Sequence, residues 1–280
     1  MKQIVTLLLL VGTSYGAFEW QQLPAYPRGM GTAFTAISTA SDALFWNPAG
    51  LSSFNGNVDL LIAYSRPFGG MDVGLNNGLV GFMKKFGDIG FGIGFGDYGA
   101  KIEGDYNGRY AEQILTAGAA LPLNERLSFG IKFNYYRLSM PRFNPSGAFG
   151  VDIGAIAKFY SKWMVGLYVQ NASSASLTAS DGTNYRLPSS LAFGVALRPY
   201  RNTLTSIDIR KEYGQPVTVA LGQSVSWNRF TLRGGVQSQG DFLQFDAGFT
   251  ARFRGFRIDY SATITPEFPV THTFTIGFGR

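Results

Sequence analysis

The chain has 280 residues, of which 45% are hydrophobic and 15% are charged, and 36 are glycine. This composition excludes a disordered or collagen-like chain and allows one large all-β domain or two ordinary ones. The absence of cysteine excludes disulfides, thiolate metal sites and a lipid anchor on cysteine. The net charge of +6 and pI of about 9.5 suit nucleic acid, an anionic membrane surface, or basic residues that line a lumen and its rims.

Residues 1–16 have the pattern of a secretory signal peptide. Lys2 supplies a positive charge, residues 4–11 form an apolar run too short to span a bilayer, and residues 14–16 form a small-x-small cleavage site. We therefore expect the mature protein to leave the cytoplasm, which argues against nucleic acid as a partner. A signal-anchor helix is the alternative. No other stretch is apolar enough for a spanning helix, so a membrane protein with this sequence would be a barrel.

Residues 17–56 lack the alternation that dominates the rest of the chain. Pro24 and Pro27 argue against a regular element at the start, whereas residues 33–46 could include a short helix that begins near Thr39 or Ser41. We predict that this segment is an N-terminal plug and that residues 57–280 form the wall around it.

Two runs in this segment, GMGTAFTA (29–36) and FWNPAGL (45–51), carry a family resemblance together with Asp42. They resemble the N-terminal signature of FadL-type transporters of hydrophobic compounds, and more closely that of the PorV/PorQ-type branch, in which the segment is a hatch inside an outer-membrane barrel. The resemblance implies plug or gate roles for the matching positions, which are Asp42, Asn47, Pro48, Ala49 and Gly50. The alternative is that Asn-Pro only starts a turn.

From residue 57 onward the sequence alternates with period two. Phe91, Ile93 and Phe95, for example, are separated by single glycines, so each such segment has one apolar face and one small or polar face. Aromatics make up 15% of the chain, more than a soluble core normally needs, and lipid is the first candidate for what they face. Counting the alternating segments predicts an all-β fold, a transmembrane antiparallel barrel of roughly 14 strands. The predicted strands are 57–66, 77–86, 88–97, 110–121, 125–139, 147–159, 162–171, 189–198, 203–212, 216–226, 229–237, 241–253, 255–265 and 271–279.

The predicted connections alternate between short and long, as the two ends of an outer-membrane barrel do. When the connections are numbered in chain order, the even-numbered ones are tight turns. The long stretches are all odd-numbered connections, and they are 67–76, 98–109, 140–146 and 172–188. Tyr and Trp near strand ends are expected in interfacial girdles. These residues are Tyr64, Tyr98, Tyr110, Tyr160, Trp163, Tyr200 and Trp227.

Most charged residues of the predicted strands share the inward parity, which is expected because Arg or Lys facing lipid costs about 2 to 4 kcal/mol at the midplane. We predict that these residues form a charge network that anchors the plug; a substrate relay is the alternative. The predicted network comprises Lys132, Asp152, Arg198, Asp208, Arg210, Arg233, Asp246, Arg257 and Asp259, and Lys158 and Arg252 share its parity.

No catalytic or metal-binding set can be assembled. The single histidine, His272, lies at the start of the last strand, and the glycine-rich runs lack the lysine of a phosphate loop. We therefore expect no enzyme activity and no cofactor.

Two functions remain open for a protein of the Gram-negative outer membrane. In the first, which the resemblance to FadL-type transporters implies, a small hydrophobic ligand such as a fatty acid or hydrocarbon passes through the plugged barrel. In the second, which the resemblance to the PorV/PorQ-type branch implies, the barrel binds a secreted protein or a component of the type IX secretion machinery and transports no small molecule. In both, the outer wall contacts membrane lipid.

Overall fold

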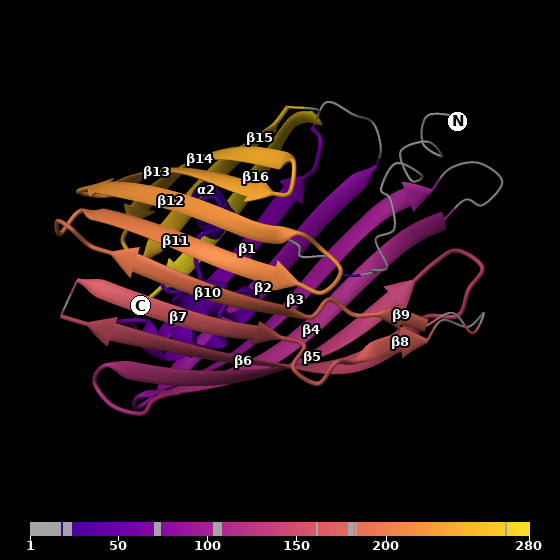
Figure 1. Cartoon of the computed structure of the whole chain (residues 1–280), viewed down its shortest axis with the longest axis horizontal. Helices are drawn as coiled ribbons and strands as arrows, with labels where there is room; N and C mark the ends of the chain where they lie inside the picture. The colour runs from indigo at the N-terminus through magenta and orange to yellow at the C-terminus, as the bar shows by residue number, and fades with distance from the viewer. Residues whose placement is uncertain are drawn as a thin grey trace.

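The computed structural model describes residues 18, 24–69, 74–102, 108–160, 162–178, 182, 184–266 and 268–280. Fourteen strands form a closed antiparallel barrel, which confirms the predicted strand number and topology (Figure 1). The expected signal peptide, residues 1–16, lies outside the described residues. The barrel strands are β1 (Val58–Arg66), β2 (Leu75–Phe86), β3 (Ile89–Ile102), β4 (Gly108–Pro122), β5 (Leu127–Ser139), β6 (Ser146–Phe159), β7 (Trp163–Gln170), β10 (Ser190–Leu197), β11 (Thr203–Glu212), β12 (Val217–Trp227), β13 (Phe230–Gln239), β14 (Phe242–Phe253), β15 (Phe256–Thr265) and β16 (Phe268–Gly279).

The barrel closes between its first and last strands. β1 and β16 pair from Asp59 opposite Gly279 to Arg66 opposite His272. The amide of Val58 donates to the carbonyl of Arg280 at 2.9 Å, and the amide of Arg280 returns a bond of the same length. Closure leaves no unpaired sheet edge, which would otherwise expose backbone donors and acceptors.

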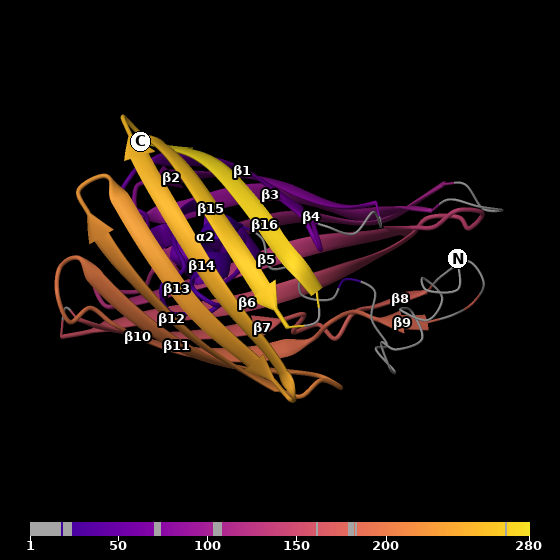
Figure 2. The same cartoon turned by 90° about the horizontal axis from the view of Figure 1, so that it is seen from above.

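The connections differ at the two ends of the barrel. At one end, called the short-turn end, lie the tight connections after β2, β4, β6, β10, β12 and β14, together with the C-terminus (Figures 1 and 2). The other end, the long-loop end, carries the connection between β7 and β10. That connection contains a small hairpin, β8 (Ser176–Thr178) paired with β9 (Asn184–Arg186), which was not predicted because three-residue strands are too short to show alternation.

Side chains along the strands alternate between the outer surface and the interior. In β12, Val217, Val219 and Leu221 are exposed, whereas Thr218 and Ala220 between them are buried. The outer wall is therefore apolar and the inner wall small or polar, as a strand with one face on lipid requires. Two residues expected in the aromatic girdle are an exception, because Tyr98 is buried inside and Tyr110 packs against a buried cluster around Tyr136.

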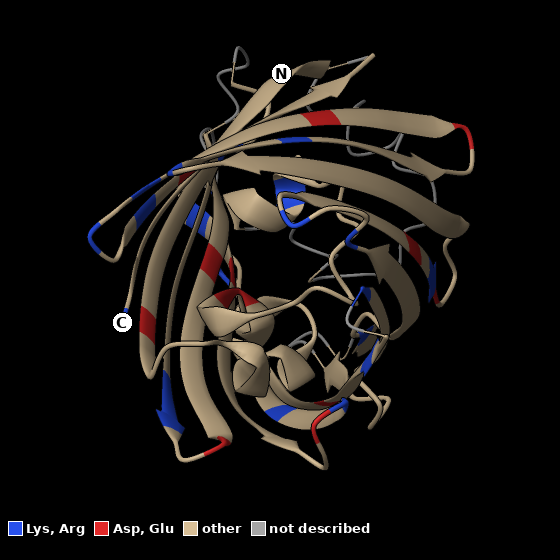
Figure 3. Cartoon of the chain, turned by 90° about the vertical axis from the view of Figure 1, so that its left-hand side faces the viewer, with Lys and Arg blue, Asp and Glu red and all other residues tan. Residues whose placement is uncertain are grey.

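Residues 24–56, called the inner segment, lie inside the ring of strands (Figure 3). They form three short helices, which are α2 (Ala25–Gly29), η1 (Ala40–Phe45) and η2 (Pro48–Ser53). The start of η1 agrees with the helix expected near Thr39, whereas α2 was not expected, because Pro24 precedes it and Pro27 lies inside it. Proline is tolerated in a first helical turn, where the amide has no helical partner in any case. None of the helices among the described residues is long and apolar enough to cross a membrane.

Candidate functional site

Asn47 begins the last helix of the inner segment. Its backbone is extended, its side-chain oxygen accepts a bond from the amide of Ala49 at 3.1 Å, and Pro48 follows at the first helical position. An Asn N-cap followed by proline is favourable, because Asn satisfies an unpaired amide and proline lacks one. The Asn-Pro pair thus starts a helix here rather than a simple turn.

The same Asn47 side chain connects the inner segment to the wall. Its amide nitrogen donates to the carbonyl of Thr35 at 2.9 Å, and to those of Ala155 in β6 and Leu167 in β7 at 3.2 Å. Asn47 is fully buried. Since a buried polar group without a partner is costly, these bonds favour a single position for residues 47–50 against β6 and β7.

Wall glycines allow the inner segment to approach the wall backbone. A Cβ added at Gly130 would collide with Pro48 and Ala49, and one at Gly166 would collide with Thr35 and Ala36. Inward glycines contact the inner segment in the same way on strands all round the barrel. The further wall positions are Gly81, Gly90, Gly92, Gly94, Gly154, Gly194, Gly222, Gly235 and Gly248. Gly50, one of the predicted gate residues, makes an equally close approach within the segment, against Ser38.

Two wall carboxylates bind backbone amides of the inner segment. Asp208 in β11 accepts from the amides of Phe34 and Thr35 at 2.9 and 2.7 Å. Asp59 in β1 accepts from the amide of Ser41 at 3.0 Å, and its carbonyl accepts from the Ser41 hydroxyl at 2.7 Å. Such bonds to a charged acceptor are stronger than neutral ones, so each carboxylate holds one bend of the segment.

The remaining predicted charges form separate groups rather than one network. Arg257 bridges Asp42 of the inner segment, at 2.8 Å, and Asp259 of the wall, at 2.9 Å; Arg233 lies 3.7 Å from the same Asp259. Across the barrel, the Lys132 ammonium lies 3.2 Å from Asp152 and donates to the carbonyl of Leu44 at 2.7 Å.

Three positions differ from the expected network. Asp246 faces Arg28 of the inner segment at 4.0 Å, and Arg210 lies over the ring of Trp46 at 5.7 Å. Arg198 belongs to none of these groups and lines a cavity at the short-turn end. Sequence reasoning missed Arg28 and Asp59. The inward parity of Asp59 on the first strand was a usable signal, whereas Arg28 lies where no periodicity orients a side chain.

Cavities lie on both sides of η1. On the long-loop side, Leu44 and Phe45 border a cavity of about 60 Å³, which is also lined by Tyr98, Tyr136 and other groups. On the short-turn side, Thr39 and Asp42 border a cavity of about 230 Å³. The helix η1, with its N-cap residue Thr39, therefore borders both spaces.

Burial raises the pKa of the Asp42 carboxyl to about 6, although Arg257 beside it acts in the opposite direction. The burial effect is the larger one because a charged carboxylate loses its hydration inside the barrel. Asp42 therefore titrates close to neutral pH, at the point where η1 meets the short-turn cavity.

These features define the protein as a closed antiparallel barrel that encloses a bonded inner segment. The structure is similar to the Ralstonia pickettii toluene transporter TbuX, with a TM-score of 0.69 and 13% identity over 94% of this chain and 100% of that one. It is also similar to the Pseudomonas putida toluene transporter TodX (TM-score 0.65, 14% identity, 90% and 95% covered) and to a Pseudomonas aeruginosa FadL homologue (0.59, 13%, 91% and 98%). No family model matches the chain, and no curated protein matches it by sequence. The similarity therefore concerns the fold.

Proposed function

We propose that this chain is an outer-membrane barrel that passes small hydrophobic molecules, with the N-terminal segment 17–56 as its plug. Exposed apolar side chains such as Ile62, Phe133 and Ile276 cover the outer wall, which suits contact with lipid. The fold is that of the toluene transporters TbuX and TodX. The expected signal peptide would direct export.

The observation that carries the proposal is the position of η1 between the two cavities. The 60 Å³ cavity is smaller than the roughly 150 Å³ that holds a benzene ring, whereas the 230 Å³ cavity is larger. A monoaromatic molecule would therefore need Phe45 or Leu44 to move before it could pass. We assign the gate to η1, with Asp42 at its short-turn face and Asn47 to Gly50 as the fixed base.

The alternative role, a PorV/PorQ-like accessory of secretion, has less support. The similar structures are channels for hydrophobic compounds, and no described surface feature favours a secreted partner. We therefore keep transport as the single proposed function.

The test uses the absence of cysteine in the chain, because an introduced pair can then form only one disulfide. Ser41 and Asp59 are in contact, so Ser41→Cys with Asp59→Cys would tie η1 to β1. Uptake of radiolabelled toluene is measured in cells that carry the double variant, oxidised and reduced. We expect uptake to be blocked in the oxidised form and restored by reduction, with unchanged uptake by the wild type under both conditions.

Equal uptake by the oxidised and reduced forms would refute the gate. Uptake no higher than in cells without the barrel, for the wild type itself, would refute transport of this compound class. Heat-modifiable migration on a gel verifies that each form is a folded barrel.

A further inference from the structure

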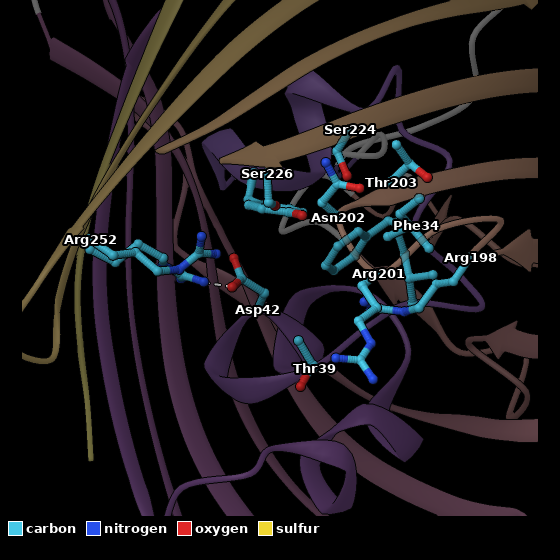
Figure 4. A pocket seen from close by; sticks show the side chains of 14 residues that line it. Phe34, Thr39, Asp42, Arg198, Arg201, Asn202, Thr203, Ser224, Ser226 and Arg252 are labelled. Atoms are coloured by element: carbon cyan, nitrogen blue, oxygen red, sulfur yellow. Dashed lines mark hydrogen bonds and ion pairs between the residues drawn. The ribbon is translucent and has the colours of Figure 1, made fainter. Parts of the chain in front are cut away.

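The cavity at the short-turn end is strongly basic (Figure 4). Four arginines line it, which are Arg198, Arg201, Arg252 and Arg257, against a single carboxylate, Asp42. A neighbouring cavity of about 290 Å³ shares Arg198 and adds Lys158. In the first cavity alone, four cations against one anion leave an excess of three positive charges, in a chain whose net charge is +6.

Most of these cations are not neutralised by the protein. Arg257 is engaged by Asp42 and Asp259. Within the part of the chain that the structure describes, Arg198, Arg201 and Arg252 form no ion pair, and the polar contact of Arg252 is a bond from its guanidinium to the Thr231 hydroxyl at 3.1 Å. Like charges gathered in a partly enclosed space repel one another, so an anion placed among them would be stabilised.

Arg198, Arg201 and Arg252 are exposed at the short-turn end, where all three line the cavity. Arg198 and Arg252 continue the inward parity of buried neighbours, Ala196 in β10 and Thr250 in β14. In Figure 4, Arg198 and Arg201 lie across the cavity from Arg252, with Asp42 between them. Arg229 and Arg254, in turns at the same end, do not line the cavity and lie over the ring of the exposed Phe253 instead.

We propose that this cavity is a binding site for the carboxylate or phosphate group of a small organic anion. The guanidinium groups offer paired donors that match the two oxygens of a carboxylate or phosphate. Ser224, Ser226 and Asn202 add neutral polar groups, while Tyr26, Phe34 and Leu204 provide an apolar wall for the rest of the molecule. The site therefore takes an amphipathic anion, with its charged end toward Arg198, Arg201 and Arg252.

The site goes beyond the proposed transport function, because it requires neither passage nor movement of η1. A negative result for toluene uptake would not contradict the anion site, and a negative result for anion binding would not contradict toluene transport.

The experiment measures binding to the full chain in detergent by isothermal titration. The probes are benzoate, its neutral isostere benzamide, and inorganic phosphate. The test variant combines Arg198→Gln, Arg201→Gln and Arg252→Gln, and leaves Arg257 in place because it holds the inner segment. The matched control combines Arg229→Gln and Arg254→Gln, which remove charge from turns at the same end outside the cavity.

We expect the wild type and the control to bind benzoate at least tenfold more tightly than benzamide, with affinity that falls as salt rises. The triple variant should lose at least tenfold in benzoate affinity and keep its heat-modifiable migration. Loss of phosphate binding in the same variant would equally support the site. Tighter binding of benzoate than of phosphate would indicate that the apolar wall contacts the rest of the ligand.

Equal binding of benzoate and benzamide, or equal benzoate binding by the triple variant and the wild type, would overturn the proposal. A lack of binding of both anions to the wild type would overturn it as well. If the triple variant fails to fold, the single variants Arg198→Gln and Arg252→Gln are titrated instead, and unchanged benzoate affinity in both would refute the site.

Discussion

Replacing Asn47 by alanine should release the inner segment without unfolding the barrel. The substitution removes the helix N-cap, which is worth about 1 kcal/mol. It also removes two bonds to the wall carbonyls of Ala155 and Leu167, at about 1 kcal/mol each. A loss of about 3 kcal/mol corresponds to an increase of about 100-fold in the population with the segment displaced.

Trypsin cleavage after Arg28 reports that population, because Arg28 lies in α2 inside the barrel, with a side chain that is only 17% exposed. When opening is fast relative to cleavage, the cleavage rate follows the fraction of open molecules. We expect the Arg28 cleavage rate, followed by mass spectrometry, to rise about 100-fold in Asn47→Ala. The control is Asn55→Ala, because Asn55 is exposed in the same segment. A rise of less than about threefold, with normal heat-modifiable migration, would refute the anchoring role of Asn47.

Three further predictions concern the contacts of the inner segment. Gly166→Ala should lower the thermal unfolding midpoint, because the added Cβ meets the backbone of Thr35. The control Gly234→Ala should leave the midpoint unchanged, because a Cβ there meets nothing within 4 Å. Equal midpoints for the two variants would contradict the close approach at Gly166. Because burial raises the pKa of Asp42 to about 6, its ionisation costs folding stability between about pH 4 and pH 6. The unfolding midpoint of the wild type should therefore fall relative to that of Asp42→Asn as the pH rises through this range, and a constant difference would contradict the raised pKa. Lys132→Met should lower the free energy of unfolding by about 3 to 5 kcal/mol, because it leaves the buried Asp152 without its cation. In the same melting assay, the double variant Lys132→Met with Asp152→Leu should recover much of that loss. A double variant as unstable as the single one would contradict this prediction.

The barrel was predictable because its information is local. Alternation along β12 or β14 reports which side chains face outward, and a charge at the wrong parity would be costly. The same parity would have corrected Tyr98, since Ile93 and Phe95 before it face outward and an even-numbered residue in β3 therefore faces inward. The error came from giving a residue-type preference more weight than the register of its strand.

The contacts of the inner segment were not predictable in the same way. Asn47 bonds to Leu167, 120 residues away, and Asp208 bonds to Phe34, 174 residues away. Nothing in the local sequence specifies such pairs, because residues 24–56 have no repeating period that fixes their orientation. Composition gave only the general condition, that inward glycines permit a close approach.

The contacts of residues 47–50 and those of η1 lie on different sides of the barrel, and this difference bears on how the proposed gate could work. Asn47 to Gly50 pack through uncharged backbone contacts against β5, β6 and β7, where glycines leave no space for rearrangement. η1 is held on the opposite side by the bonds of Ser41 to Asp59 and the contact of Asp42 with Arg257, and the bond of Lys132 to the Leu44 carbonyl holds it as well. It borders a cavity on each face. Although η1 is itself buried and packs against wall glycines through Leu44 and Phe45, it is the helix with open space on two sides, so we expect a movement that opens a path to occur there. If residues 47–50 stay fixed while η1 moves, the proposed passage requires displacement of one short helix and not of the whole inner segment.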